Sequence, residues 1–108
     1  MTNKLNWKIF SAQERNTALE ALKDIISSND GFIVDFNFFS DLALTLTIEI
    51  EERRIKGLHS AISQIANISE LENIAFDPES VKEWWIFLNI NFAEGTGELK
   101  VIIPEIPG

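Results

Sequence analysis

The sequence predicts an α+β protein in which an antiparallel sheet carries two helices on one face. Residues 42–52 alternate between large apolar and small or polar side chains, which is the period of a strand with one buried and one exposed face. Residues 84–92 repeat this alternation with larger side chains, and residues 18–26 and 53–67 carry apolar residues at helical spacing. A sheet that is covered on one side only is typically antiparallel.

The 108 residues predict a single domain spanning 1–108. Because 45% of the residues are hydrophobic and 24% are charged, we expect a folded core. The chain has no cysteine, which excludes disulfides and thiolate ligands and fits a reducing, cytoplasmic location. No signal peptide is recognisable at the N-terminus and no run of 18 apolar residues occurs, so we expect neither secretion nor a membrane span.

The formal net charge is −8 and the pI is near 4.5. Such a chain repels phosphate backbones and anionic lipids, so we expect no nucleic-acid partner and no membrane partner. A basic protein would be attracted, although the same charge also serves solubility.

The first half of the chain predicts a strand at residues 5–10, a helix, and a second strand at residues 32–39. Ser11 and Glu14 have the spacing of a capping box at the start of the helix, and Gly31 suits a left-handed residue at its end. The buried stripe of the helix is expected to comprise Ala18, Leu19, Leu22, Ile25 and Ile26.

The turn between the second and third strands is constrained by parity, because residues paired across a ladder share a face. A two-residue loop at positions 40–41 would pair polar with core residues. A three-residue loop at 39–41 places Phe38 opposite Leu42, and a five-residue loop also keeps the faces consistent.

The second half predicts a helix over 53–67, a short edge strand at 71–76, and a helical turn that begins at Asp77 and Pro78. Residues 84–92 and 98–103 would then form a C-terminal hairpin, with Ile90 opposite Leu99.

This order resembles the ferredoxin-like βαββαβ fold with an additional C-terminal β-hairpin, in which the third strand is central. Residues 55–76 also resemble ACT-type regulatory domains. The resemblance implies self-association. Such domains bind effectors near a glycine-containing turn after the first strand, but the turn at residues 11–14 has no glycine, so no effector site is carried over.

Few residues suggest chemistry. His59 is the only histidine, and no group that would complete a catalytic or metal site is recognisable around it. Glu49, Glu51 and Glu52 are interpreted as a solvated strand end, because two arginines follow them directly.

Other polar positions have equally simple interpretations. Asp35 and Asn37 would lie on the exposed sheet face near Thr45 and Thr47. The glycines at 95 and 97 are interpreted as a hairpin turn, since a strand follows them where a phosphate-binding loop needs a helix. We therefore predict no catalytic residue, metal or cofactor.

The outer face of the C-terminal hairpin is the candidate interface. Trp84 and Trp85 are adjacent, so in a strand they point to opposite faces. Trp85 and Phe87 would then lie beside Ile102 and Pro104 in one apolar patch. Either a partner covers this patch or the chain does so itself, with residues 68–81 or 105–107.

The sequence therefore predicts a non-catalytic protein-association domain, homodimeric through the C-terminal hairpin. Alternatives are an acidic inhibitor or immunity-type protein that binds a basic partner, and a small-ligand regulatory domain. An enzyme is the last function class that we consider.

Overall fold

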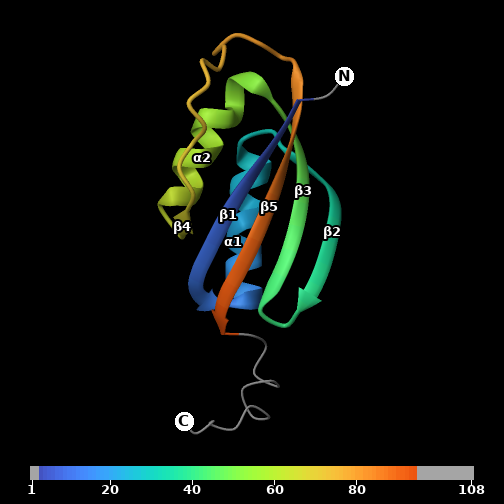
Figure 1. Cartoon of the computed structure of the whole chain (residues 1–108), viewed down its shortest axis with the longest axis vertical. Helices are drawn as coiled ribbons and strands as arrows, with labels where there is room; N and C mark the ends of the chain where they lie inside the picture. The colour runs from blue at the N-terminus through green and yellow to red at the C-terminus, as the bar shows by residue number, and fades with distance from the viewer. Residues whose placement is uncertain (1–2, 95–108) are drawn as a thin grey trace, which may run out of the picture.

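The computed structural model describes residues 3–94, and these form one five-stranded mixed sheet with two helices (Figure 1). The strands are β1 (Asn3–Glu14), β2 (Phe32–Ser40), β3 (Ala43–Glu51), β4 (Asn67–Ile68) and β5 (Glu83–Glu94). The helices are α1 (Arg15–Ser28) and α2 (Ile55–Ser63), the latter preceded by a 3-10 turn at Glu52–Arg54. The predicted α+β class is confirmed. Neither α1 nor α2, the helices of the described residues, is long and apolar enough to cross a bilayer.

The strand order β2-β3-β5-β1-β4 places β5 at the centre of the sheet. β5 pairs in parallel with β1 and antiparallel with β3. The order differs from the ferredoxin-like prediction because β5 lies between β1 and β3, and its parallel pairing with β1 makes the sheet mixed where an antiparallel sheet was predicted. The pattern of β5 explains this, because both of its faces carry aromatic residues, and a central strand has neighbours on both sides to pack against them.

The predicted C-terminal hairpin involves residues 98–103, which lie outside the described residues. Within the described residues, Ile90 of β5 pairs with Ile9 of β1 on one side and with Leu44 of β3 on the other.

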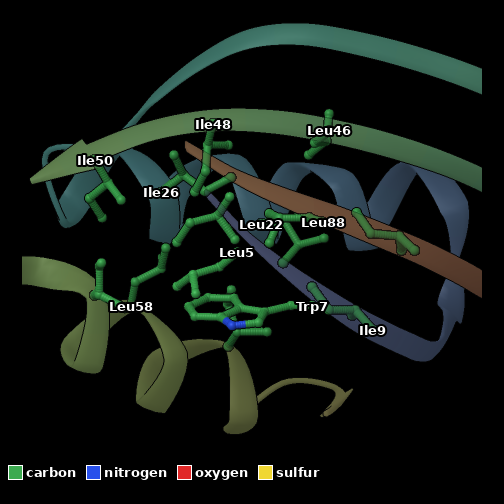
Figure 2. Packing of buried hydrophobic residues seen from close by; sticks show 14 of the residues in the cluster. Leu5, Trp7, Ile9, Leu22, Ile26, Leu46, Ile48, Ile50, Leu58 and Leu88 are labelled. Carbon is green, nitrogen blue, oxygen red and sulfur yellow. The ribbon is translucent and has the colours of Figure 1, made fainter. Parts of the chain in front are cut away.

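The core lies on the helix side of the sheet, as the alternating patterns predict. Figure 2 shows side chains from β1, β3 and β5 meeting those of α1 and α2, with Trp7 beside α2. The alternate residues of 84–92 that begin with Trp84 are all buried, which confirms the predicted inward face of β5. Four of the five residues expected in α1 are also buried, with Ile25 half-buried. The largest fully buried side chains include Trp7, Ile9, Leu22, Ile26, Leu46, Ile48, Ile55, Leu58, Ile62 and Ile86.

The ends of α1 differ from the prediction in detail. Glu14 is itself the N-cap, and its carboxylate accepts hydrogen bonds from the backbone amides of Asn16 and Thr17. Ser11 is buried in β1 instead. At the other end the left-handed residue is Asp30, with φ of 61°, and not Gly31 as predicted. Gly31 directly precedes the first residue of β2.

In the β2–β3 hairpin, bulges keep the paired residues of the two strands on the same face. Phe38 pairs with Leu44, which is the register of the five-residue loop and not that of the three-residue loop. Ser40 pairs with Ala43, so the turn itself is two residues long and the register shifts at Phe39. A second shift lies at Val34. An extra residue on one strand restores matching faces just as an odd loop would.

Helix α2 is shorter than predicted, and the edge strand that follows it, β4, lies closer to the helix in the sequence than the predicted strand at 71–76. β4 pairs Ile68 with Ile9 of β1, whereas residues 71–76 are not a strand. Phe76 is buried against Trp84, with ring centroids 5.4 Å apart. The carboxylate of Asp77 accepts from the amide of Glu79 in a turn that does not continue into a helix.

The central position of β5 makes a stability prediction. Leu88→Ala removes a fully buried side chain between two neighbouring strands, and we expect it to lower the free energy of unfolding by about 2–5 kcal/mol. The control Val81→Ala, at a side chain that is 62% exposed, should change it by less than about 0.5 kcal/mol. Urea denaturation measures both, and equal effects would contradict this topology.

Candidate functional site

The outer strand β2 carries most of the exposed apolar surface of the described residues. Nine large hydrophobic side chains are exposed, and five of them lie on this strand: Phe32, Val34, Phe36, Phe38 and Phe39. We call these five residues the β2 edge. Phe32 and Phe39 are 69% and 71% exposed, so most of the surface of each residue lies in solvent. Apolar surface exposed in quantity on one element is a sign of an interaction site.

The pairing with β3 shows how the β2 edge is built. Phe36 and Phe38 lie opposite Leu46 and Leu44 and therefore share the helix-side face. Their ring centroids are 5.2 Å apart. In Figure 1, however, β2 lies at the side of the sheet opposite β4 and α2. The buried face of the sheet thus continues onto β2 without enough helix to cover it.

Arg15, at the start of α1, holds Phe38 of the β2 edge in place. The guanidinium carbon of Arg15 lies 4.9 Å from the ring centroid of Phe38, and Nη1 of Arg15 lies 3.1 Å from Oδ1 of Asp41. The side chains of Arg15 and Asp41 are only 19% and 14% exposed. A cation over an aromatic face is attracted by the ring quadrupole. Arg15 therefore fixes Phe38 while leaving half of its ring open.

The open face of the sheet is the second candidate surface, and it holds Trp85 and Phe87. Trp85 lies between Glu49 and Lys4 on the neighbouring strands, and Phe87 pairs with Thr47 on β3. Trp85 donates a hydrogen bond from Nε1 to Oε2 of Glu49, at 3.2 Å. Both aromatic side chains are half-buried among these neighbours. They expose less surface than the β2 edge.

Two of the four predicted interface residues, Ile102 and Pro104, lie outside the described residues. The described connection between β4 and β5 does not cover Trp85. Its Phe76 packs on the core residue Trp84, and Glu72 accepts a hydrogen bond from Nε1 of Trp7 on the same helix side, at 2.9 Å. Trp84 and Trp85 thus face opposite sides of the sheet.

His59 has structural partners. Its Nε2 lies 2.8 Å from the carbonyl oxygen of Ser69, so this nitrogen carries the proton and donates. Its ring meets that of Trp7 edge to face at 5.0 Å. These contacts join α2 to β1 and to the residues that follow β4.

The three glutamates near the end of β3 point to separate partners. Glu49 accepts from Trp85, Glu51 pairs with Arg53 at 2.7 Å, and Glu52 accepts from the amide of Asp77 and from Nε1 of Trp84. Within residues 3–94 no three histidine, aspartate or glutamate side chains are grouped to hold a metal ion. The glycines at 95 and 97 lie outside the described residues.

A shallow concavity of about 420 Å³ lies on the open face where β1 meets β4. Its lining includes Lys8, Phe10, Asn67, Ser69 and Asn91. It does not lie between α1 and the sheet, which, with a dimer seam, is one of the two places where a small-ligand regulatory domain would hold its pocket. Asp35 and Asn37 do lie opposite Thr47 and Thr45, as predicted, but on β2 and away from this concavity.

The sequence contained one signal for the β2 edge that the prediction did not use. Residues 32–39 carry aromatic or branched side chains on both faces of one strand, and only Asp35 among them is charged. A strand of this kind is either central or in contact with a partner.

Comparison with known proteins gives no match: no protein-family model matches the chain, and no match is found among curated proteins or solved structures.

Glu52 has a pKa below its ordinary value of 4.5, because the backbone amide of Asp77 donates to its carboxylate and Trp84 donates as well. These bonds tie the connection before β5 to the end of β3. Since the folded-state pKa lies below the unfolded one, the stability that this carboxylate contributes is fully present above about pH 4.5 and is lost as the pH falls through the folded-state pKa.

We therefore expect Glu52→Gln to be less stable than wild type at pH 7, with a difference that shrinks as the pH falls below 4.5. Urea denaturation at a series of pH values measures this. Glu20→Gln is the matched control, since Glu20 is 75% exposed and 3.9 Å from Lys23, and its difference from wild type should stay small throughout. Parallel pH curves for wild type and Glu52→Gln would contradict the assigned role.

Proposed function

We propose that the protein is a non-catalytic protein-association domain that forms a homodimer. The observation that supports this most directly is the β2 edge, where five of the nine large hydrophobic side chains exposed within residues 3–94 lie on one strand. A phenylalanine side chain presents roughly 150–250 Å² of surface, so the exposed fractions correspond to about 500 Å² of apolar area over the two faces of this strand. A stable interface of standard size buries about 800 Å² per partner, of which somewhat more than half is apolar.

The polar groups of the molecule support an association role over a catalytic one. The nitrogen Nε2 of His59 is held by a carbonyl, and each glutamate of the group at 49–52 has its own donor or cation. Catalysis by acid–base chemistry needs such groups to converge on one substrate position. A cytoplasmic location is part of the proposal and is supported by the absence of cysteine.

Two surfaces can serve this association. The sequence-based anchors Trp85, Phe87, Ile102 and Pro104 would use the open sheet face. Trp85 and Phe87 are half-buried in their own sheet, and Trp85 already donates its indole hydrogen to Glu49. The side chains of the β2 edge are more exposed. We therefore favour the β2 edge as the main surface.

A second candidate function is an acidic inhibitor that masks a basic partner. The observation that favours it is the connection between β4 and β5, where residues 69–83 hold five acidic side chains and a single lysine. Glu72 and Asp77 accept hydrogen bonds within the fold, whereas Glu70, Glu79 and Glu83 are exposed to solvent. This function would give binding that weakens steeply with salt.

The association is tested by light scattering coupled to size-exclusion chromatography. We expect wild type to elute as a dimer that dissociates on dilution, and Trp85→Ala to retain the dimer. A wild-type protein that stays monomeric at every concentration would overturn the proposed function. Loss of the dimer in Trp85→Ala would show that the interface is the open face of the sheet and not the β2 edge.

A further inference from the structure

The two edges of the sheet are built differently. β4 closes one edge with only two residues, and such short edge strands resist pairing with other chains. β2 forms the other edge with nine residues and contains no lysine, arginine or proline. Proteins use these residues to prevent edge-to-edge pairing. β2 does carry bulges at Val34 and Phe39 and the charge of Asp35, but the regular stretch 35–38 between the bulges has no lysine, arginine or proline.

We propose that two copies of this chain pair their β2 strands antiparallel about a two-fold axis at Asn37, which joins two sheets into one. This inference rests on the proposed association function and assigns its surface and register. Because the axis of such a pair is perpendicular to the sheet, both helix layers lie on the same face, and each residue pairs with one that points the same way.

The register follows from the stretch between the two bulges. From Asp35 to Phe38 the strand is regular, with Phe36 and Phe38 on the helix side and Asp35 and Asn37 on the open side. A pair centred on Asp35 would oppose two carboxylates directly. In a pair centred on Phe36 the two Asp35 residues would be diagonal neighbours across the strands, about 7–8 Å apart.

The pair centred on Asn37 is the most favourable of these. It separates the two Asp35 side chains by about 14 Å along the strands, which exceeds the screening length at physiological salt. It also pairs Phe36 with Phe38 of the second copy twice, which joins two aromatic pairs into one cluster on the helix side. The uncharged Asn37 then meets its own copy on the open side.

The charge of the molecule predicts how this dimer responds to salt. Each copy carries −8, while residues 32–40 contribute a single charge. The attraction is therefore apolar and the long-range force is repulsive. We expect the dimer to become tighter as salt is added, whereas a complex with a basic partner would become weaker.

Cross-linking tests the register, since the chain has no cysteine of its own. We expect Asn37→Cys to form a disulfide-linked dimer under mild oxidation, because opposed residues of an antiparallel pair lie within about 4.5–5.5 Å. Asp35→Cys is the matched control on the same face of the same strand, and it should stay unlinked. Preferential linkage of Phe36→Cys, or equal linkage at 35 and 37, would overturn the proposed register.

Charge substitution tests the surface without cross-linking. Asn37→Lys places two cations opposite each other at the axis, so we expect the dimer dissociation constant to rise at least about tenfold, with partial recovery in salt. Asp35→Lys places the same charge away from the axis and should keep the dimer. If wild type is a dimer and Asn37→Lys leaves it unchanged, the inference fails while the proposed function stands. If wild type is a monomer, both fail.

Discussion

The parallel pairing of β5 with β1, next to the antiparallel pairing of β5 with β3, is the constraint on which the rest of the structure depends. It joins the two ends of the described chain at the centre of the sheet. With both sides of β5 occupied, β3 lies on one flank and β1 on the other. β2 is thereby placed at the edge, away from α2 and beyond the cover of the helices. The exposed aromatic strand is a consequence of this order.

The connection between β4 and β5 also stabilises the central strands of the sheet. Phe76 packs on Trp84, and Glu52 accepts hydrogen bonds from Trp84 and from the amide of Asp77. Trp7 donates to Glu72 across the core. In these contacts the rings of Trp7 and Trp84 are buried while their Nε1 atoms donate hydrogen bonds. Each ring is therefore held both by packing and by a directional hydrogen bond. All of these contacts lie on the helix side, so within residues 3–94 this connection covers neither the open face nor the β2 edge.

Much of the fold was predictable because side-chain alternation reports which face of a strand is buried. The inward residues of β1, β3 and β5 are buried as this pattern predicts, and so are four of the five stripe residues of α1, with Ile25 half-buried. The neighbours of a strand were not predictable in the same way. Ile9 and Ile90 are far apart in sequence, and a period of two is the same whichever strand lies beside them.

The candidate site shows the same limit. The sequence indicates that Trp85 points away from Trp84, and the structure agrees. It also shows Phe36 and Phe38 on the core face of their strand, but whether a helix covers that face depends on strand order. The bulges at Val34 and Phe39 add to the difficulty, since each one reverses the parity on which a register argument relies.

Residue-resolved amide hydrogen exchange at high and low protein concentration reports the pairing of β5 and of β2 in one experiment. We expect the amides of β5 to be protected at every concentration and the outward amides of β2 to become protected only when the protein is concentrated. Outward β2 amides that exchange rapidly at all concentrations, or β5 amides that exchange rapidly along one side, would contradict this expectation.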